Sequence, residues 1–368
     1  MNQELIDLLK NLVKINSIYP QEKEISDYLF KYLKSNGFKV QKQKVDLNRF
    51  NLLASKGSGK KFILFYGHLD TVPVVERENW ETDPHKPVIK SNKLFGLGAS
   101  DMKGGLSAFL TATKETNLPI KILLAADEEN ISEGAWKAVK ENKTFFKDVE
   151  LVISSEPSFG LGLNGITTGR TGRCIYEIVF KGKPAHIIKY KEGVDAFKKL
   201  TDFGSKLYKV RETLFKSKDT VIQIRKISGE SQGMSVCGEA RAEVEVILGA
   251  EDNVKSVLAK LKLLSKAEVS IKPRKTPYLE GYYFKEFPYQ KEFENIIKEY
   301  TKKTMQLHRR KSVGDDNVLA SLGIPVVTWG PEGGNEHKPN EYVDIKSLDI
   351  LSKMYKSLLE RIEKANEK

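Results

Sequence analysis

The sequence predicts an α/β fold: a mostly parallel sheet with helices on both faces, into which a smaller α+β domain is inserted. Three observations lead to this prediction. Apolar runs of strand length alternate with segments of helical periodicity, this alternation gives way to amphipathic strands near residue 165, and it resumes near residue 277. The outer domain is therefore expected to comprise residues 1–164 and 277–368, and the inserted domain residues 165–276.

Apolar positions at helical spacing predict the helices of the outer domain, and alternating or continuous apolar runs predict its strands. Before the insertion, the expected helices are 2–16, 21–36, 104–113 and 131–142, and the expected strands are FKVQKQKV, FNLLASKG, KFILFYG, KILLAAD and ELVISSE. After the insertion, the expected elements are a helix over 289–304, the strand IPVVTWG and a C-terminal helix over 348–368.

The inserted domain has the order β-α-β-β-α-β, which is the arrangement of a ferredoxin-like α+β domain. Its expected strands are GRTGRCIYEIVFKGKPAHI with its turn, DTVIQIRKIS, EARAEVEVIL and AEVSIKP. Its expected helices are 194–211 and 252–265.

The 368 residues are 40% hydrophobic and 30% charged, which is typical of a soluble globular protein of two domains. No run of about 18 apolar residues occurs, and the amphipathic N-terminus lacks the basic start and cleavage site of a signal peptide. We therefore expect a cytoplasmic protein without a membrane span. Cys174 and Cys237 have no neighbour at zinc-site spacing and are expected to be buried free thiols.

The net charge of +12 comes mostly from lysine. A basic protein can bind nucleic acid. Here, however, the Lys and Arg residues are spread along the chain, and the densest cluster is the run HRRK at 308–311. We interpret the charge as a solvated, lysine-rich surface, and nucleic acid is not an expected partner.

Two histidines and four carboxylates stand where apolar runs give way to loops, in the segments GHLDTVP, GASDMKGG, DEENIS, SSEPS and NEHKPNE. They are His68, Asp101, Glu128, Glu129, Glu156 and His337. Imidazole nitrogen and carboxylate oxygen ligate Zn²⁺, and carboxylates also suit Mn²⁺. Each motif alone could be a surface turn, but together they predict a two-metal hydrolase site.

The sequence indicates different tasks within this set. His68 and Asp70 point the same way if the strand continues, so His68 can ligate a metal while Asp70 orients it. Asp101, in a glycine-flanked loop, can present both carboxylate oxygens and bridge two metals. Of the adjacent Glu128 and Glu129, one can bind metal while the other acts as general base. The alternative is that both acids stabilise the N-terminus of the helix that follows.

His186, in FKGKPAHI, belongs to the inserted domain and lies away in sequence from every expected ligand. It could reach an active site and stabilise an oxyanion, or it could be a structural loop residue. His85 and His308 have no supporting context, and we interpret both as surface residues.

The motifs GHLDTVP, GASDMKGG, DEE, SEPS, GKPAH and HKPNE together resemble those of the M20 family of metallopeptidases and amidohydrolases, over nearly the whole chain. The resemblance implies a catalytic domain of the di-zinc exopeptidase type and an inserted lid that also forms a dimer interface. It implies that His68, Asp101 and Glu156 hold one metal, and that Asp101, Glu129 and His337 hold the second.

The same resemblance implies that Glu128 is the general acid/base and that Asp70 supports His68. It implies that His186 binds the substrate carbonyl, often in the site of the dimer partner. The chain departs from the family pattern where substrate is bound: Met234 stands where many members have Asn, and Ile247 replaces an Arg that often binds a substrate carboxylate.

Arg170 or Arg173 would have to compensate for that missing arginine. Asp315, in VGDDN, falls near a substrate-side loop of the family.

The implied function is a hydrolase that uses two divalent ions, with Zn²⁺ expected first and Co²⁺ or Mn²⁺ as alternatives. Its expected substrate is an N-acyl amino acid of a biosynthetic route, acetylated, succinylated, or carried as lysine or ornithine on a small acidic protein. A carboxypeptidase or dipeptidase is the alternative. A non-catalytic binding protein is disfavoured because Glu128 and every expected ligand are present. A homodimer through the inserted domain is expected.

Overall fold

The computed structural model describes residues 2–366, and the chain in it divides into two compact units. Unit 1 contains the described residues up to Thr168, Phe284–His308, and the described residues from Gly314 onward. Unit 2 contains Gly169–Tyr283 and Arg309–Val313. The sequence predicts the inserted domain over 165–276. In the structure, this unit also includes the segment Arg309–Val313, which the sequence analysis places in the outer domain.

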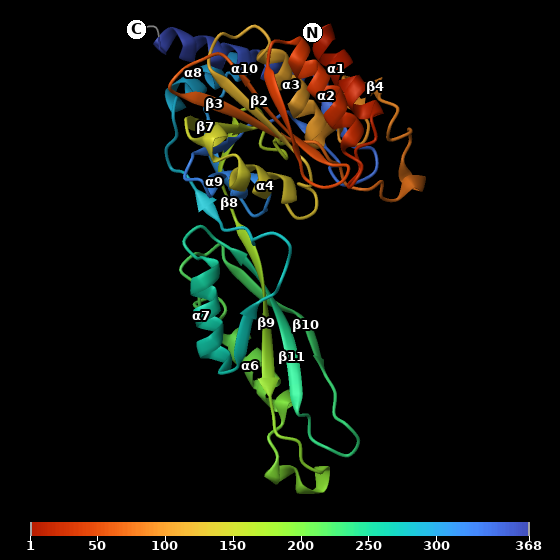
Figure 1. Ribbon diagram of the computed structural model, residues 1–368, viewed down its shortest axis with the longest axis vertical. Helices are drawn as coiled ribbons and strands as arrows, with labels where there is room; N and C mark the ends of the chain where they lie inside the picture. The colour runs from red at the N-terminus through yellow and green to blue at the C-terminus, as the bar shows by residue number, and fades with distance from the viewer. Residues whose placement is uncertain (1, 367–368) are drawn as a thin grey trace. The chain divides into compact units, whose positions relative to one another are not determined.

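Unit 1 is built on a twisted sheet whose four central strands, in the order β6-β3-β7-β15, are parallel (Figure 1). Antiparallel strands continue it at both edges: β2 and β1 beyond β6, and β8 beyond β15. The strands are β1 (Lys39–Lys44), β2 (Phe50–Lys56), β3 (Phe62–His68), β6 (Ile120–Ala125), β7 (Val149–Ser154), β8 (Gly165–Arg170) and β15 (Val326–Thr328). β8 also pairs with β13 (Tyr282–Tyr283) and β14 (Gln306–Arg310).

Helices cover both faces of this sheet, as the sequence predicts, because its central strands are apolar on both sides. Figure 1 shows α1, α3 and α10 over one face and α4 and α9 over the other. The helices of unit 1 are α1 (Gln3–Lys14), α2 (Lys23–Ser35), α3 (Gly105–Ala112), α4 (Glu133–Glu141), α5 (Lys143–Phe146), α8 (Gln290–Thr301), α9 (Asp315–Ala320) and α10 (Ile345–Asn366). The last helix was predicted from 348, and positions 367 and 368 of that prediction lie outside the described residues.

The core on the α1/α3/α10 side is continuous and contains large aromatic groups. Phe65 of β3 stacks on Phe109 of α3 at 5.3 Å between ring centroids, and Trp329 meets Tyr355 of α10 edge-on at 5.4 Å. Each such ring buries a large apolar area, so this packing holds the central strands rigidly. None of the helices between residues 2 and 366 contains a stretch both long and apolar enough to cross a bilayer.

A second, small antiparallel sheet in unit 1 was not predicted. Its strands, in the order β16-β17-β5-β4, are β16 (Gly333–Gly334), β17 (Tyr342–Asp344), β5 (Lys93–Phe95) and β4 (Val88–Lys90). Strands of two or three residues are too short to show an alternating pattern, which is why the sequence did not reveal them. The pairing of β17 with β5 joins two segments about 250 residues apart in the chain.

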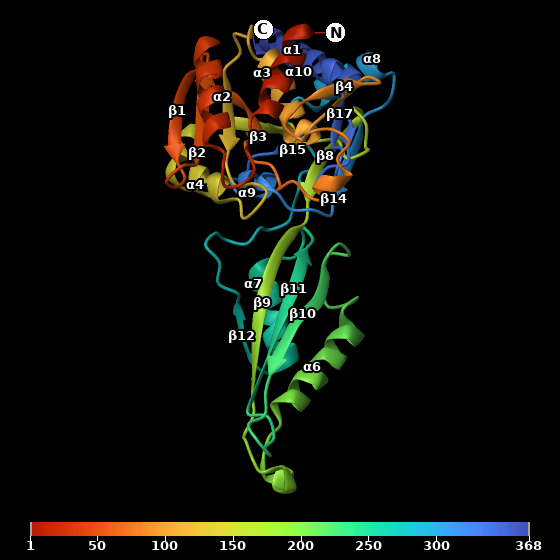
Figure 2. The ribbon, with the colours of Figure 1, turned by 90° about the vertical axis from the view of Figure 1, so that its right-hand side faces the viewer.

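Unit 2 has the predicted β-α-β-β-α-β order, formed by β9 (Gly172–Lys181), α6 (Ala196–Val210), β10 (Val221–Gly229), β11 (Glu239–Leu248), α7 (Val254–Ser265) and β12 (Glu268–Ile271). The strands form one antiparallel sheet in the order β10-β11-β9-β12. Figure 2 shows both helices beside this sheet. Alternate residues of β9 and β11 pack under the helices, and Cys174 and Cys237 are confirmed as buried free thiols in this core.

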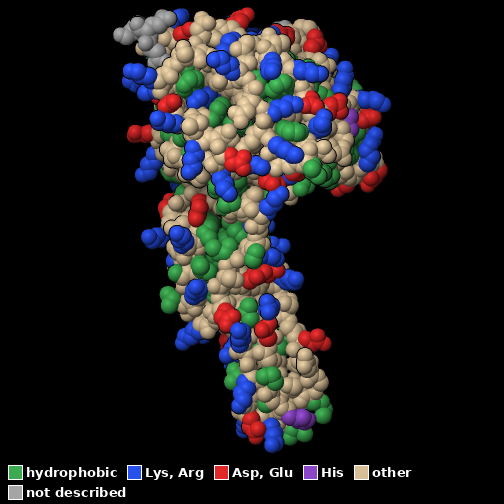
Figure 3. All heavy atoms as spheres, in the orientation of Figure 1, with side chains coloured by type: hydrophobic (Ala, Val, Ile, Leu, Met, Phe, Trp, Pro, Cys, Tyr) green, Lys and Arg blue, Asp and Glu red, His purple; other side chains and the backbone are tan. Residues whose placement is uncertain are grey.

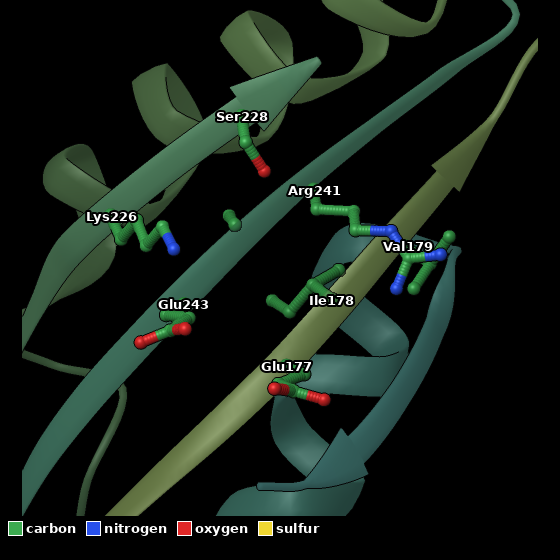
Figure 4. A pocket seen from close by; sticks show the side chains of 8 residues that line it. Glu177, Ile178, Val179, Lys226, Ser228, Arg241 and Glu243 are labelled. Carbon is green, nitrogen blue, oxygen red and sulfur yellow. The ribbon is translucent and has the colours of Figure 1, made fainter.

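The opposite face of the unit 2 sheet is charged (Figure 4). It forms a shallow pocket of about 210 Å³ lined by Glu177, Lys226, Arg241 and Glu243, among others. In unit 1, Lys and Arg side chains lie scattered among Asp and Glu over the face seen in Figure 3. This distribution agrees with the interpretation of the net charge as a solvated surface.

Candidate metal centre

The expected ligands of unit 1 extend from the carboxyl ends of its four central strands. His68 is the last residue of β3, Glu128 and Glu129 follow β6, and Glu156 follows β7. His337 lies further along the chain, in the loop between the short strands β16 and β17. Because parallel strands end at the same edge of a sheet, these side chains meet in one place although up to 269 residues separate them (337 − 68).

Asp101 lies between the two histidines. Its Oδ1 is 3.0 Å from His68 Nε2, and its Oδ2 is 3.4 Å from His337 Nε2. The same His337 nitrogen lies 3.2 Å from Glu129 Oε1. One carboxylate thus presents one oxygen to each imidazole, which is the arrangement that a ligand shared by two metal ions requires.

Two overlapping groups of ligand atoms occur among the described residues. The first contains His68, Glu128 and Glu156, and the second contains His68, Asp101 and Glu129, with the atoms of each group within 4.8 Å of one another. The grouping places Glu128 as close to the candidate ligands as Glu129 is. Geometry alone therefore does not separate the base from the ligand, and their division of tasks stays a prediction.

The pKa shifts of the residues at this centre indicate a site for cations. Burial, and then the charge of Glu156, raise the pKa of Glu128 well above its usual range. Burial also raises the pKa of Glu129. Although burial alone would lower it, the hydrogen bond to Asp101 and the nearby carboxylates raise the pKa of His68. Buried carboxylates hold protons this tightly when no opposite charge compensates them.

These residues fit a pair of divalent ions. The donor atoms are carboxylate oxygens and imidazole nitrogens, which suit Zn²⁺, Co²⁺ or Mn²⁺. The hydrogen bonds to Asp101 and Glu129 raise the pKa of His337 to about 10. A metal ion at this position would replace the proton that the two carboxylates now share with the imidazole.

Asp70, predicted to orient His68, contacts both that histidine and the turn that carries Glu128 and Glu129. His68 Nδ1 donates to the backbone carbonyl of Asp70 at 2.9 Å, while the nearer carboxylate oxygen of Asp70 is 3.7 Å away. The carboxylate instead accepts the backbone N–H groups of Glu128, at 3.1 Å, and Glu129, at 2.9 Å. Asp70 therefore fixes His68, with Nε2 left for a metal, through its backbone, and it fixes the Glu128–Glu129 turn through its side chain.

A buried arginine that the sequence analysis missed also stabilises the Glu128–Glu129 turn. Arg49 is 3% exposed, and its guanidinium pairs with Asp127 at 2.6 Å, Asp46 at 2.7 Å and Glu133 at 3.1 Å. Asp127, which immediately precedes Glu128, has a φ of 75°. A left-handed conformation at a residue with a side chain needs such support. The one signal in the sequence was an arginine directly before a strand with an apolar centre, β2.

Glu22 packs against this arginine, 3.8 Å from its guanidinium, and is fully buried. Burial, together with the charge of Asp70, raises the pKa of Glu22 from 4.5 to about 8. A carboxyl whose folded pKa is raised favours the fold in its protonated form. Its contribution is therefore complete below pH 4.5 and is lost as the pH rises through 8.

Glu22→Gln should consequently flatten the pH dependence of stability. Relative to the variant, the wild type should lose up to about 1.4 kcal/mol of unfolding free energy per pH unit across this window. Urea unfolding of both proteins at several pH values between 4.5 and 8 measures the difference. Parallel dependences in the two proteins would show that folding does not raise the pKa of Glu22.

The other histidines and the acid singled out from the sequence have different settings. His186 is in unit 2, on an exposed segment, where its Nδ1 accepts the N–H of Ile188 at 3.3 Å. Asp315 is buried in unit 1 and accepts a hydrogen bond of 2.7 Å from the hydroxyl of Tyr66. His85 and His308, interpreted as surface residues, are instead half-buried.

Two substitutions in unit 2 mark where the chain departs from the family pattern. Met234 is 67% exposed, and Ile247 is half-buried on β11 directly opposite Arg173. Arg173, one of the two residues proposed to compensate, is paired with Glu245 at 2.6 Å. Arg170, the other, is buried at 4% exposure.

Comparisons with known proteins identify the family of the chain. The model of peptidase family M20/M25/M40 matches residues 64–361. A succinyl-diaminopimelate desuccinylase of Buchnera aphidicola is 25% identical over 98% of this chain and 100% of its own length. Another, from Wolbachia pipientis, is 31% identical over 60% of this chain and 55% of its own.

Solved structures share the fold. Aminopeptidase PepT from Bacillus cereus superposes with a TM-score of 0.78 at 20% identity, covering 98% of both chains. An M20 family metallo-carboxypeptidase from Sulfolobus solfataricus gives 0.74 at 19% identity, over 98% of this chain and 99% of its own. The fold and the centre define a metal-dependent hydrolase of amide or peptide bonds. The chain belongs to peptidase family M20/M25/M40, whose model covers most of its length.

Proposed function

We propose that the protein hydrolyses the amide bond of an N-acyl amino acid, using two divalent ions held in unit 1. The observation that carries the proposal is the position of Asp101, with one carboxylate oxygen toward each histidine. The full-length similarity to succinyl-diaminopimelate desuccinylases supports an acylated, carboxylate-bearing substrate. The net charge of +12 favours anionic substrates in general.

His68, Asp101 and Glu156 would hold one ion, and Asp101, Glu129 and His337 the other. When bound, the ions supply the Lewis acid that polarises the scissile carbonyl and activates water for attack. Zn²⁺ is proposed first, and Co²⁺ or Mn²⁺ would fit the same donors.

Glu128 would perform the proton transfers of the reaction. Its carboxylate would take a proton from the attacking water and deliver it to the nitrogen of the leaving amine. Its place beside the candidate ligands suits this task, because a general base must lie near hydrogen-bond range of the attacking water. Asp70 and the Arg49–Asp127 pair would keep Glu128 in place through the backbone of its turn.

His186 would stabilise the negative charge that develops on the substrate oxygen. Its exposed position on unit 2 leaves the ring accessible to a ligand. His186→Ala should lower kcat by about 10²–10³-fold, the usual effect of losing one oxyanion donor, with metal content unchanged. Steady-state kinetics and metal analysis of the same preparations measure both quantities. A variant with wild-type kcat would remove His186 from the mechanism.

The proposed homodimer through unit 2 allows the role of His186 to be tested by mixing two variants. If His186 serves the partner's site, mixing inactive Glu128→Gln protein with inactive His186→Ala protein should restore part of the activity. One site of each heterodimer then contains both intact residues. Verified subunit exchange without recovery would mean that His186 acts within its own chain or has no catalytic role.

A substrate panel tests the proposed function. Purified protein with Zn²⁺, Co²⁺ or Mn²⁺ should hydrolyse N-succinyl-diaminopimelate, N-acetyl-ornithine or an N-acyl-lysine faster than dipeptides. Glu128→Gln protein is the control for contaminating hydrolases. A preference for dipeptides would favour the carboxypeptidase or dipeptidase alternative. Hydrolysis of an amino acid only when it is linked to an acidic carrier protein would identify that carrier as the partner.

A further inference from the structure

Glu341 makes an unusual set of contacts beside the metal centre. Its side chain is 2% exposed and accepts three hydrogen bonds, all from backbone N–H groups of one loop. Oε2 accepts from Gly98 at 2.7 Å, and Oε1 accepts from Ser100 and from Asp101, both at 2.9 Å. One carboxylate therefore holds the loop segment that ends in the central residue of the proposed site.

The same residue anchors the loop to the segment that carries the second histidine. Glu341 immediately precedes β17, which pairs with β5, and its carbonyl accepts the N–H of Gly96 at 3.0 Å. His337 is four residues before Glu341 in the chain. Glu341 thus joins the loop that carries Asp101 to the segment that carries His337.

The chemistry of the three contacts requires a carboxylate. A backbone N–H can only donate, so every partner of Glu341 needs an acceptor. A carboxylate offers acceptors on both oxygens, whereas a glutamine would direct an NH₂ group at one of the donors. Gly98 has a φ of 75°, so the turn that presents these N–H groups also depends on a residue without a side chain.

We propose that Glu341 is a positioning residue that holds the Asp101 loop in the conformation that binds metal. The inference rests on the proposed function, because it presumes that Asp101 is a metal ligand. Without Glu341, the N–H groups of Gly98, Ser100 and Asp101 lose their common acceptor, and the Asp101 carboxylate is no longer held between His68 and His337. Losing a residue that orients a metal ligand typically weakens metal binding by about 10–100-fold.

The test compares Zn²⁺ binding by full-length wild type, Glu341→Gln and Glu336→Gln. Each protein is stripped of metal and titrated with Zn²⁺ against a chromophoric chelator. Glu336 provides a matched control, because it lies in the same segment and accepts only the Ser100 hydroxyl, at 2.7 Å, a contact that a glutamine oxygen can keep. Glu341→Gln should bind Zn²⁺ about 10–100-fold more weakly, and Glu336→Gln should resemble the wild type.

A Co²⁺ absorption spectrum gives a readout that a general loss of stability would not produce. The folded, Co²⁺-saturated Glu341→Gln protein should show altered bands, because the geometry at Asp101 changes. Zn²⁺ affinity and Co²⁺ spectra equal to those of the wild type would overturn the inference while leaving the proposed function intact. A wild type that binds no Zn²⁺ would overturn both.

Hydrogen exchange keeps the inference testable if Glu341→Gln does not fold. In metal-free wild type, the amides of Gly98, Ser100 and Asp101 should exchange slowly, because Glu341 holds them without help from a metal. Exchange of these three amides at the rate of exposed loop amides would overturn the inference.

Discussion

Glu128→Gln should abolish turnover while leaving both metal ions in place. The substitution removes the proton acceptor, and a general base typically contributes about 10²–10⁴-fold to the rate. The amide has nearly the size of the carboxylate, and the contacts that hold the turn are made by backbone N–H groups, so Asp70 should still bind it. Steady-state kcat and metal content of the same preparation measure the effect.

Glu129→Gln is the matched comparison, because it is the same change one residue along the chain. It should weaken metal binding, since Glu129 contacts His337 at 3.2 Å and groups with His68 and Asp101. This pair of variants shows which of the two glutamates is the general base and which is the metal ligand. If Glu128→Gln lost metal and Glu129→Gln kept it, the assignments would be reversed. More than about a tenth of wild-type kcat in Glu128→Gln would exclude it as the base.

Asp101→Ala should lose metal from both positions and become inactive. Its two oxygens face different histidines, so its removal takes a ligand from each ion at once. His337→Ala should weaken only one position, because His337 contacts Asp101 and Glu129, while the other proposed ligand set, His68, Asp101 and Glu156, stays complete. Metal analysis after dialysis against a weak chelator distinguishes the variants. Two tightly held ions in Asp101→Ala would contradict a shared ligand.

The sequence was sufficient to predict the elements that have a regular apolar pattern and the residues that directly follow them. Continuous apolar runs predicted β3, β6 and β7, and the residues that follow them, His68, Glu128 and Glu156, converge as parallel topology requires. The β-α-β-β-α-β order of unit 2 was visible for the same reason. Its strand β11 alternates between residues packed in the core and residues of the opposite, charged face.

What the sequence could not show is how the centre is supported. Arg49, Asp127 and Glu341 act on backbone groups or on one another, and such contacts leave no spacing pattern in a chain. Asp70 shows the same limit, because its position suggested a side-chain contact with His68 that the backbone carbonyl makes instead. The short strand β17, which brings Glu341 to the Asp101 loop, has no period to detect.

Anomalous diffraction from crystals of the Zn²⁺-loaded protein tests the central claim most directly. Two peaks should occur about 3.5–4 Å apart, with Asp101 between them, one beside His68 and Glu156 and the other beside Glu129 and His337. A single peak, or two peaks that do not share Asp101, would contradict the two-metal centre.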